Sequence, residues 1–440
     1  MKRTVSVLLA LLLPVLAFGQ DLPAKYLAAL TNSEVPGGSG IYRGLTFHAP
    51  FTDPAAPLTV YKGSALTFTR ATTATYVHPT TGLITTATAG QLRIEASGAL
   101  IEGARTNIVP YSEDWSNAVW DIYAGAAFVI TVDNTIAPDG TLTADRLTST
   151  TGVNDVTQNF QTIDADGELY TGSFYVKKGN SSTIRADLRL GGKNYAYGIN
   201  IDTGEFTAYA DVAIAASLKD APNGFKRVAI VGLNNGVTTE MQLHLWANRS
   251  VNDNTGYNYF WGGQFEKGAF ASSYIPTGAT AISRNADVLT YPAAGNINSA
   301  TGTVSVEVSF EGHNVVGGDK LQQGVIGGGA DGADVPIYRS NNNPGLTSYT
   351  GAGSLAVAVG TLANNYAPYK IALSWGGKAI AASVNSGAVL TGTFVDSPLV
   401  MGTNPFLGND PYVDQMWGWI KNVRLWNRNL SDDELQAMTR

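Results

Sequence analysis

Hydrophobic and polar positions alternate with a period of two over much of this chain, which is the pattern of half-buried β-strands. In residues 171–177, Thr, Ser, Tyr and Lys occupy one set of alternating positions, and Gly, Phe and Val occupy the other. Residues 240–245 repeat the pattern, with Glu, Gln and His set against Met, Leu and Leu. Such alternation buries one face of an antiparallel sheet and leaves the other face in water. We therefore predict an all-β protein.

Strand-length runs follow one another between residues 107 and 280, and turn residues bound each run. They read AAFVITVDN, LYTGSFYVKKG, STIRADLRLG, YAYGINIDTGEFTAY, GFKRVAIVGL, TEMQLHLWA and YNYFWGGQFEKG. Short strands at regular spacing predict an antiparallel β-sandwich, here a jelly roll similar to a carbohydrate-binding module.

A second sandwich is predicted over residues 299–440, after a linker at 281–298. The boundary stretch SSYIPTGATAISRNADVLTYPAAGN, residues 272–296, carries two prolines and small residues. Its strand-length runs include TGTVSVEVSF, SLAVAVGTL, YKIALSWGGKAIAASVN and MWGWIKNVRLWNRNL. The final segment, SDDELQAMTR, predicts a short helix in which Ser431 and Glu434 form a capping box. The two sandwiches are expected in tandem.

Residues 20–106 have no sustained helical period and are punctuated by PGGSG, DPAAP and HPTTG. We interpret this region as an extended arm with short strands that packs on another domain or another subunit, since it lacks a core of its own. At its end, Glu102 and Arg105 are interpreted as a structural ion pair that holds the junction with the first sandwich.

Composition narrows the range of functions. Of the 440 residues, 49 are Gly and only 14% are charged, which suits short strands and tight turns. The net charge of −7 and the absence of a Lys/Arg cluster exclude nucleic acid as a partner. The sequence has no Cys, so thiol nucleophiles, thiolate metal sites and disulfides are excluded as well.

Residues 1–19 resemble a Sec-type signal peptide. Lys2 and Arg3 form the basic region, an apolar stretch follows from Val5 to Leu16, and Ala17–Gly19 form a small-x-small cleavage site. An uncleaved anchor is the alternative. The pattern predicts secretion.

The segment LIEGARTNIVPYSEDWSNAVW, residues 100–120, concentrates acidic and aromatic side chains. Glu113 and Asp114 are adjacent, and adjacent residues of an extended segment point to opposite faces, so they form a poor acid–base pair. If the segment turns into one helical turn, Ser112 is its natural cap and the acids lie favourably at its start.

Tryptophans are the candidate binding residues, because an exposed indole face can stack on the apolar face of a sugar ring. Core packing is the alternative for each of them. The candidates for glycan stacking are Trp115 and Trp120 in the first sandwich, and Trp417, Trp419 and Trp426 in the second.

Several loops carry oxygen ligands that calcium could use, although none has an EF-hand or nonapeptide repeat. Solvated turns are the favoured interpretation, so no cofactor is predicted and calcium stays an alternative at Asp331, Asp334, Asp410 and Asp414. The four His lie far apart in the sequence, without HxH or HExxH spacing. No GxSxG, Walker loop or dinucleotide motif occurs, so we expect no enzyme activity.

The N-terminal half resembles bacteriophage virion proteins of the head-spike and tail-fibre type. The resemblance lies in an ordered series of stretches from about residue 66 to 289: LTFTRATTATYV, GLI, GALIEGARTNIVPYSEDWSNAVW, APDGTLTADRL, YTGSFYVK, WGGQFEKGAFASSYIPT and SRNADVL. It implies a structural component of a virion, a homo-oligomer with the trimer favoured, and contacts with other virion proteins. QLRIEASGAL departs from the usual run of that family.

The C-terminal part resembles concanavalin-like, laminin-G-type (LamG-like) jelly rolls. The resembling residues are YKIALSWGGKAIAASVNSG, LVMGTN and GWIKNVRLWNRNLSDDELQAM. This resemblance implies the fold and says little about any one ligand.

Together these observations predict a non-enzymatic phage fibre or spike protein whose sandwiches bind glycans on a cell surface and mediate host adhesion, located on the virion surface. A secreted bacterial glycan-binding adhesion protein is the alternative, favoured by the signal peptide. A jelly-roll glycoside hydrolase or lyase is the third hypothesis, and it requires paired carboxylates in a groove.

Overall fold

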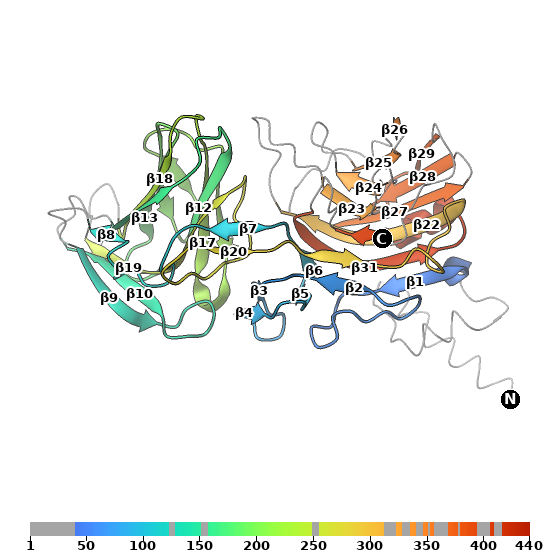
Figure 1. Cartoon of the computed structure of the whole chain (residues 1–440), viewed down its shortest axis with the longest axis horizontal. Coiled ribbons are helices and arrows are strands. Elements are labelled where there is room, and N and C mark those ends of the chain that lie inside the picture. The colour runs from blue at the N-terminus through green and yellow to red at the C-terminus, as the bar shows by residue number, and fades with distance from the viewer. Residues whose placement is uncertain are drawn as a thin grey trace.

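A computed structural model describes most of the chain between residue 40 and the C-terminus. The described residues are 40–122, 128–150, 157–248, 255–311, 323–327, 335–339, 346–350, 353–355, 368–376, 379–393, 405–408 and 416–440. They form two β-sandwiches that lie side by side, as Figure 1 shows. The predicted signal peptide and the four aspartates of the calcium alternative lie outside the described residues.

The middle sandwich consists of two six-stranded antiparallel sheets. The β12 sheet has the order β16-β17-β12-β19-β10-β9, with bounds Ala215–Asp220, Lys226–Leu233, Leu169–Lys178, Gly256–Lys267, Ala144–Ser149 and Phe128–Thr135. The β13 sheet has the order β15-β14-β13-β18-β11-β8, with bounds Phe206–Ala208, Lys193–Asn200, Thr183–Leu190, Glu240–Trp246, Thr157–Thr162 and Asp121–Ile122.

Alternation along these strands builds the core between the two sheets. Phe174 and Phe260 of the β12 sheet meet Leu188 and Leu243 of the β13 sheet, and all four side chains are fully buried. A 3-10 turn, η2 (Pro222–Gly224), joins β16 to β17. The predicted antiparallel sandwich is confirmed. The predicted wet face of β12 is wrong for most of the strand, because Thr171, Ser173 and Tyr175 on its other face are buried as well.

The C-terminal sandwich has an eight-stranded and a seven-stranded sheet. The β22 sheet follows the order β29-β28-β27-β22-β31-β6-β5, and β1 also pairs with β31; the bounds are Leu390–Thr393, Ala379–Val384, Tyr369–Gly376, Thr301–Phe310, Gly418–Trp426, Gly98–Ile101, Arg93–Glu95 and, for β1, Leu45–Ala49. The β23 sheet follows the order β2-β21-β30-β23-β24-β25-β26, with bounds Thr67–Thr69, Val288–Thr290, Phe406–Leu407, Gln323–Gly327, Val335–Arg339, Leu346–Thr350 and Gly353–Leu355.

The N-terminal arm belongs to this C-terminal sandwich. One edge of β31 pairs with β22, and its other edge pairs with β6 and β1 in succession, at residues 418–420 and 423–426. Strand β2 pairs with β21 in the opposite sheet. Phe47 and Phe68 of the arm are buried in the same core as Val306 and Ile371. The sequence predicted that the arm packs on another domain or on another subunit. The structure shows that it packs on the C-terminal sandwich of its own chain.

The middle sandwich is inserted between two strands that form a neck. The chain leaves the arm through β7 (Arg105–Asn107) and returns through β20 (Ile282–Arg284), and these strands pair antiparallel. Figure 1 shows them crossing from one sandwich to the other. The sandwiches are therefore connected by two chain segments, in contrast to the single linker that a tandem order implies.

Two further elements complete the described fold. A small hairpin, β3 (Ala74–Val77) and β4 (Ile84–Ala87), lies beside the neck, and η1 (Gly40–Tyr42) precedes β1. Helix α3 (Asp432–Met438) closes the chain with the predicted capping box, in which Ser431 Oγ accepts from Glu434 N–H and the Glu434 carboxylate accepts from Ser431 N–H. Within the part of the chain that the structure describes, no helix has the length and apolar character that a membrane crossing requires.

Candidate functional site: a groove between the sandwiches

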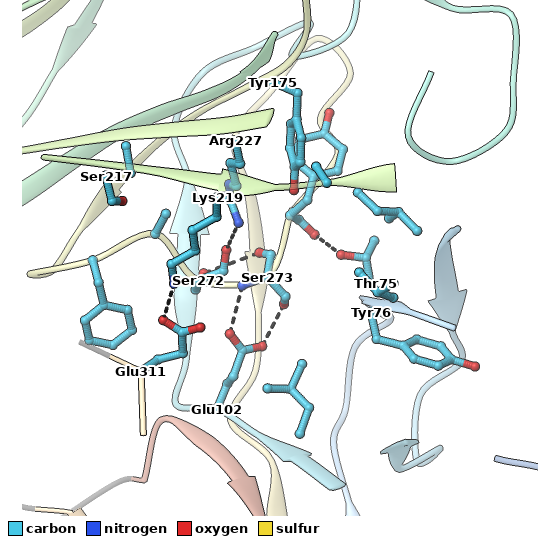
Figure 2. A pocket seen from close by; sticks show the side chains of 18 of the residues that line it. Thr75, Tyr76, Glu102, Tyr175, Ser217, Lys219, Arg227, Ser272, Ser273 and Glu311 are labelled. Atoms are coloured by element: carbon cyan, nitrogen blue, oxygen red, sulfur yellow. Dashed lines mark hydrogen bonds and ion pairs between the residues drawn. The ribbon is translucent and has the colours of Figure 1, made fainter. Parts of the chain in front are cut away.

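A groove of about 190 Å³ lies where the two sandwiches and the β3–β4 hairpin meet. Strands β16 and β17 and the segment after β19 line it from the middle sandwich, while β31 and the end of β22 line it from the C-terminal sandwich. Figure 2 shows side chains of β16, β17 and the hairpin converging on this space, together with Ser272, Ser273 and Glu311. The groove is thus a product of the domain arrangement.

Trp419 forms part of the groove wall and is held in place by a carboxylate. Its half-buried ring packs against Tyr76 and Leu100, and its indole N–H donates to Glu95 Oε2 at 2.8 Å. Glu95 Oε1 accepts from Val77 N–H at 2.7 Å. Burial raises the pKa of the Glu95 carboxyl above its ordinary value, and these two hydrogen bonds oppose the rise.

An ion pair joins the two sandwiches across the groove. Lys219 Nζ on β16 lies 2.7 Å from Glu311 Oε2, at the residue that follows β22. Glu311 N–H in turn donates to Trp417 O at 2.7 Å. Figure 2 shows this pair beside Ser272 and Ser273. The groove thus has a cation and an anion from different sandwiches at one rim.

The segment 272–274 supplies the remaining polar groups. Arg227 Nη1 donates to Ser272 O at 2.5 Å, and its guanidinium lies 5.2 Å from the ring centre of Tyr175. Ser273 donates both its N–H and its hydroxyl to Glu102. Thr75 Oγ1 of the hairpin donates to Tyr274 O, which ties the hairpin to the middle sandwich.

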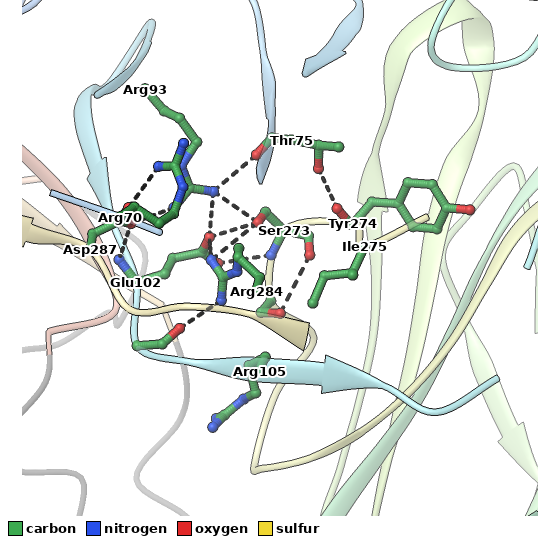
Figure 3. Close-up of polar contacts among 12 residues, drawn as sticks. Arg70, Thr75, Arg93, Glu102, Arg105, Ser273, Tyr274, Ile275, Arg284 and Asp287 are labelled. Carbon is green, nitrogen blue, oxygen red and sulfur yellow. Dashed lines mark hydrogen bonds and ion pairs between the residues drawn. The ribbon is translucent and has the colours of Figure 1, made fainter. Parts of the chain in front are cut away.

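Behind the groove lies a buried charge network of three arginines and two acids, drawn in Figure 3. Arg93 donates to Glu102 Oε2 at 2.7 Å and to Asp287 Oδ2 at 2.5 Å. Arg70 donates to Asp287 Oδ1 at 2.8 Å, and Arg284 donates to Glu102. All five residues are at most 4% exposed. The network fastens the arm to the returning chain after β20.

The charges of this network determine the protonation of Glu102. Burial by itself raises the pKa of this carboxyl, but Arg284 and Arg93 outweigh burial and lower the pKa to about 2. Glu102 also accepts two bonds from Ser273, so both of its oxygens are occupied. It lines the groove as a fixed anion.

The predicted ion pair between Glu102 and Arg105 is wrong. Arg105 instead lies 3.6 Å from Glu266 Oε2 and places its guanidinium 4.1 Å from the ring centre of Trp417. Glu102 points toward Arg93, on the neighbouring strand β5, and toward Arg284, which is 182 residues away in the sequence. The spacing of three residues in the sequence suggested Arg105 as the partner of Glu102, whereas the fold places two other arginines against this carboxylate.

The helical turn that was considered as one possibility for residues 112–115 does not form. Successive β-turns run from Tyr111 to Trp120, each closed by an i to i+3 hydrogen bond. Ser112 Oγ accepts from Thr277 N–H at 2.9 Å and lies 2.7 Å from Tyr274 Oη, while Asp114 caps the next turn by accepting from Ser116 N–H. Glu113 accepts from Tyr274 Oη at 3.1 Å, so the two adjacent acids do separate work, as predicted.

Four of the five tryptophan candidates are core residues, which corrects the glycan-stacking hypothesis for them. Trp115 and Trp120 are 0% and 2% exposed and lie against each other, with ring centres 4.0 Å apart. Trp426 is fully buried and donates its indole N–H to Ile41 O. Trp417 is 4% exposed and packs on Phe270 at the contact between sandwiches. A ring enclosed in this way cannot stack on a sugar.

Trp419 is the candidate that keeps an accessible face, and of the five it alone lines the groove. Its partners were not identified from the sequence. Glu95, Lys219 and Glu311 are separated by more than 90 residues from one another, and no local motif marks them.

The two His with buried rings, His48 and His244, lie in different sandwiches. Among the described residues no group of three His, Asp or Glu is placed to hold a metal ion.

Comparisons with known proteins gave distant structural likenesses. No family model and no curated protein matches the sequence. Domain 4 of AbnA, an extracellular GH43 arabinanase from Geobacillus stearothermophilus solved with arabinotriose, is 15% identical over 39% of this chain and 82% of that chain, with a TM-score of 0.28. The CBM40 of the Ruminococcus gnavus IT-sialidase is 18% identical over 32% of this chain and 84% of that chain, with a TM-score of 0.26. Trypanosoma rangeli sialidase is 11% identical over 67% of this chain and 58% of that chain, with a TM-score of 0.28. At these scores no functional argument rests on them.

Proposed function

We propose that this protein binds glycans through the groove between its sandwiches and serves as a non-enzymatic surface adhesion protein. The observation that carries the proposal is the placement of Trp419. Its ring is fixed by Glu95 and faces a groove that also presents charged and hydroxyl side chains. Sugar sites in proteins combine an aromatic face for the C–H side of the ring with hydrogen-bonding groups for its hydroxyls.

The size of the groove indicates a short ligand. At about 190 Å³ it is smaller than the roughly 300–1,000 Å³ of sites for drug-sized molecules, which favours the end of a glycan chain over its middle. Such a site is weak by itself, and avidity among copies of the chain raises the effective affinity by about 10²–10⁴-fold. This is consistent with adhesion through many weak contacts.

The biological setting we propose is a virion fibre or spike, on the basis of the ordered stretches between residues 66 and 289 that resemble that family. A secreted bacterial adhesion protein has the same molecular activity. Gene neighbourhood separates the two: portal, capsid and tail genes nearby support the virion, and their absence supports secretion. In either setting the ligand is a cell-surface glycan.

Calorimetric titration with a panel of neutral and acidic oligosaccharides tests the groove. Trp419→Ala should weaken binding about tenfold, as expected for the loss of a stacking contact of roughly 1–1.5 kcal/mol. Trp419→Phe keeps an aromatic face and should retain most of the affinity, so it separates a binding defect from a folding defect. Phe160→Ala is the matched control, because Phe160 is 42% exposed on the β13 sheet. Equal binding by wild type and Trp419→Ala contradicts the proposal.

A glycoside hydrolase is the second candidate, since burial raises the pKa of Glu95 as a general acid requires. The other acids at the groove argue against it. Glu102 accepts hydrogen bonds from two arginines and from Ser273. Glu311 is paired with Lys219, and Asp220 is paired with Lys226. Release of reducing ends by wild type, lost in Glu95→Gln, would favour the hydrolase over the binding protein.

A further inference from the structure

The outer face of the β12 sheet carries aromatic and cationic side chains on four neighbouring strands. Because Leu147 and Phe260 point into the core, the residues adjacent to them point outward. One cross-strand row contains Thr131 of β9, Arg146 of β10, Tyr259 of β19 and Lys177 of β12. The next row contains Val129, Thr148 and Tyr257. We call these seven residues the tyrosine face.

Every described side chain of this face is open to solvent to some degree. Val129 is 51% exposed, and the other six residues are half-buried. Tyr257 and Tyr259 are edge-to-face neighbours with ring centres 5.7 Å apart. Arg146 lies 5.2 Å from the ring centre of Tyr257, and Lys177 extends over Phe225. The rings and cations thus form one continuous surface.

Among the residues that the structure describes, no Asp or Glu forms an ion pair with the cations of the tyrosine face. Within the described residues Arg146 donates one bond, to Thr131 Oγ1 at 3.3 Å, and its Nε–H has no acceptor. Thr148 Oγ1 also has no hydrogen-bond partner there. Asp133 and Asp139 are the acids of β9 and of the loop after it, and neither forms an ion pair with Arg146 or Lys177. The face is therefore locally positive in a chain of net charge −7.

The β13 sheet has a similar group of an arginine beside aromatic rings, but there a carboxylate neutralises the arginine. Arg185 lies 5.3 Å from the ring centre of Tyr209 and 4.2 Å from that of Trp246. There, however, Asp187 accepts two bonds of 2.7 Å from the same guanidinium. A ligand carboxylate could displace Asp187 from Arg185 only by leaving Asp187 unpaired and buried, since Asp187 is 0% exposed. Within the described residues, Arg146 has no carboxylate in the position that Asp187 takes beside Arg185.

We propose that the tyrosine face binds an acidic polysaccharide, with a ligand carboxylate on Arg146 and sugar rings on Tyr257 and Tyr259. A half-buried guanidinium that forms no ion pair within the described chain matches a carboxylate, and flat phenol rings match the apolar faces of pyranoses. The row from Thr131 to Lys177 crosses four strands, about 14 Å at the usual strand spacing, so it spans several sugar units. This site is distinct from the groove and does not depend on it.

A single-stranded nucleic acid also uses stacked aromatics and cations, but it needs a track of many basic residues. The tyrosine face has two cations, Arg146 and Lys177, and the chain as a whole is acidic. The balance of charges therefore favours a carboxylated glycan, whose charges are fewer and alternate with neutral hydroxyls.

Calorimetric titration of the full chain with tetragalacturonate tests this proposal, with cellotetraose as the neutral match and a thymidine oligonucleotide as the competing class. We expect binding of the acidic oligosaccharide that weakens between 50 and 500 mM NaCl, because exposed charges are screened by salt. Arg146→Gln should reduce affinity at least tenfold, the usual loss for a hydrogen bond to a charged group, and Lys177→Gln should reduce it less. Tyr257→Ala should also weaken binding.

The matched control is Tyr209→Ala, which removes an exposed tyrosine beside an arginine on the other sheet and should leave affinity unchanged. Phe160→Ala removes an exposed aromatic ring that lies outside both the groove and the tyrosine face, and it should leave affinity unchanged as well. Equal binding of both tetrasaccharides, full affinity of Arg146→Gln, or tighter binding of the oligonucleotide would each overturn the proposal. Far-UV circular dichroism of every variant excludes unfolding as the cause.

Discussion

Replacing Asp287 by Asn should destabilise the C-terminal sandwich strongly while it changes the shape of one side chain very little. Asp287 Oδ1 accepts from Arg70, and Oδ2 accepts from Arg93 and from Glu102 N–H. An asparagine has one acceptor oxygen, so its amide group must face a donor. The change also leaves three buried guanidinium groups with Glu102 as the remaining carboxylate of the network.

The magnitude follows from the burial of the network. Removing one partner of a fully buried ion pair costs about 3–5 kcal/mol, because the opposite charge remains out of water and unpaired. Asp287 and both of its arginine side chains are 0% exposed, so solvent screening offers little relief. With a slope of about 4 kcal/mol per M in guanidinium chloride, the midpoint should fall by about 1 M.

Equilibrium unfolding in guanidinium chloride, followed by near-ultraviolet circular dichroism, measures this shift. The control is Asp202→Asn, which removes the partner of Lys178 in a pair whose side chains are 49% and 43% exposed, and which should cost at most about 1 kcal/mol. If Asp287→Asn shifts the midpoint no more than Asp202→Asn does, the network contributes no more than a surface pair and the reasoning is refuted.

Three further predictions concern pH, the closing helix and assembly. Burial, assisted by Arg424, lowers the pKa of His48 to about 3. Below pH 6.5 the unfolded chain takes up a proton at this residue and the folded chain does not, so stability should decrease as the pH is lowered, by about 2 kcal/mol at pH 5. His48→Gln should flatten this dependence in urea titrations. Ser431→Ala removes the cap of α3 and should cost about 1 kcal/mol, seen as faster hydrogen exchange in residues 432–438; unchanged exchange counts against the cap. From the fibre-type resemblance we expect light scattering to return three times the 46.3 kDa chain, and a monomer mass at micromolar concentration contradicts the trimer.

The sequence determined the class of fold and its local elements, because those depend on short-range patterns. Alternation at residues 171–177 and 240–245 predicted strands β12 and β18, and both exist with the apolar set in the core between the sheets. The pattern did not predict that the other face of β12 is buried too. Ser431 and Glu434 predicted the capping box, since its two partners are three residues apart. The sequence alone was sufficient for features whose interacting residues lie within a few positions of one another, such as strands and helix caps.

The candidate site and the pairing of the arm depended on the tertiary structure. Glu102 had Arg105 three residues away, yet it pairs with Arg93 and Arg284, because the pairing of β5 with β6 and of β20 with β7 brings those arginines to it. A tryptophan in a strand pattern can face the core or the solvent, and the choice depends on what covers it. The middle sandwich covers Trp417, whereas Trp419, two residues further along, borders the groove that the same contact leaves open. Burial is a property of the whole assembly of sheets, and only the folded chain decided it.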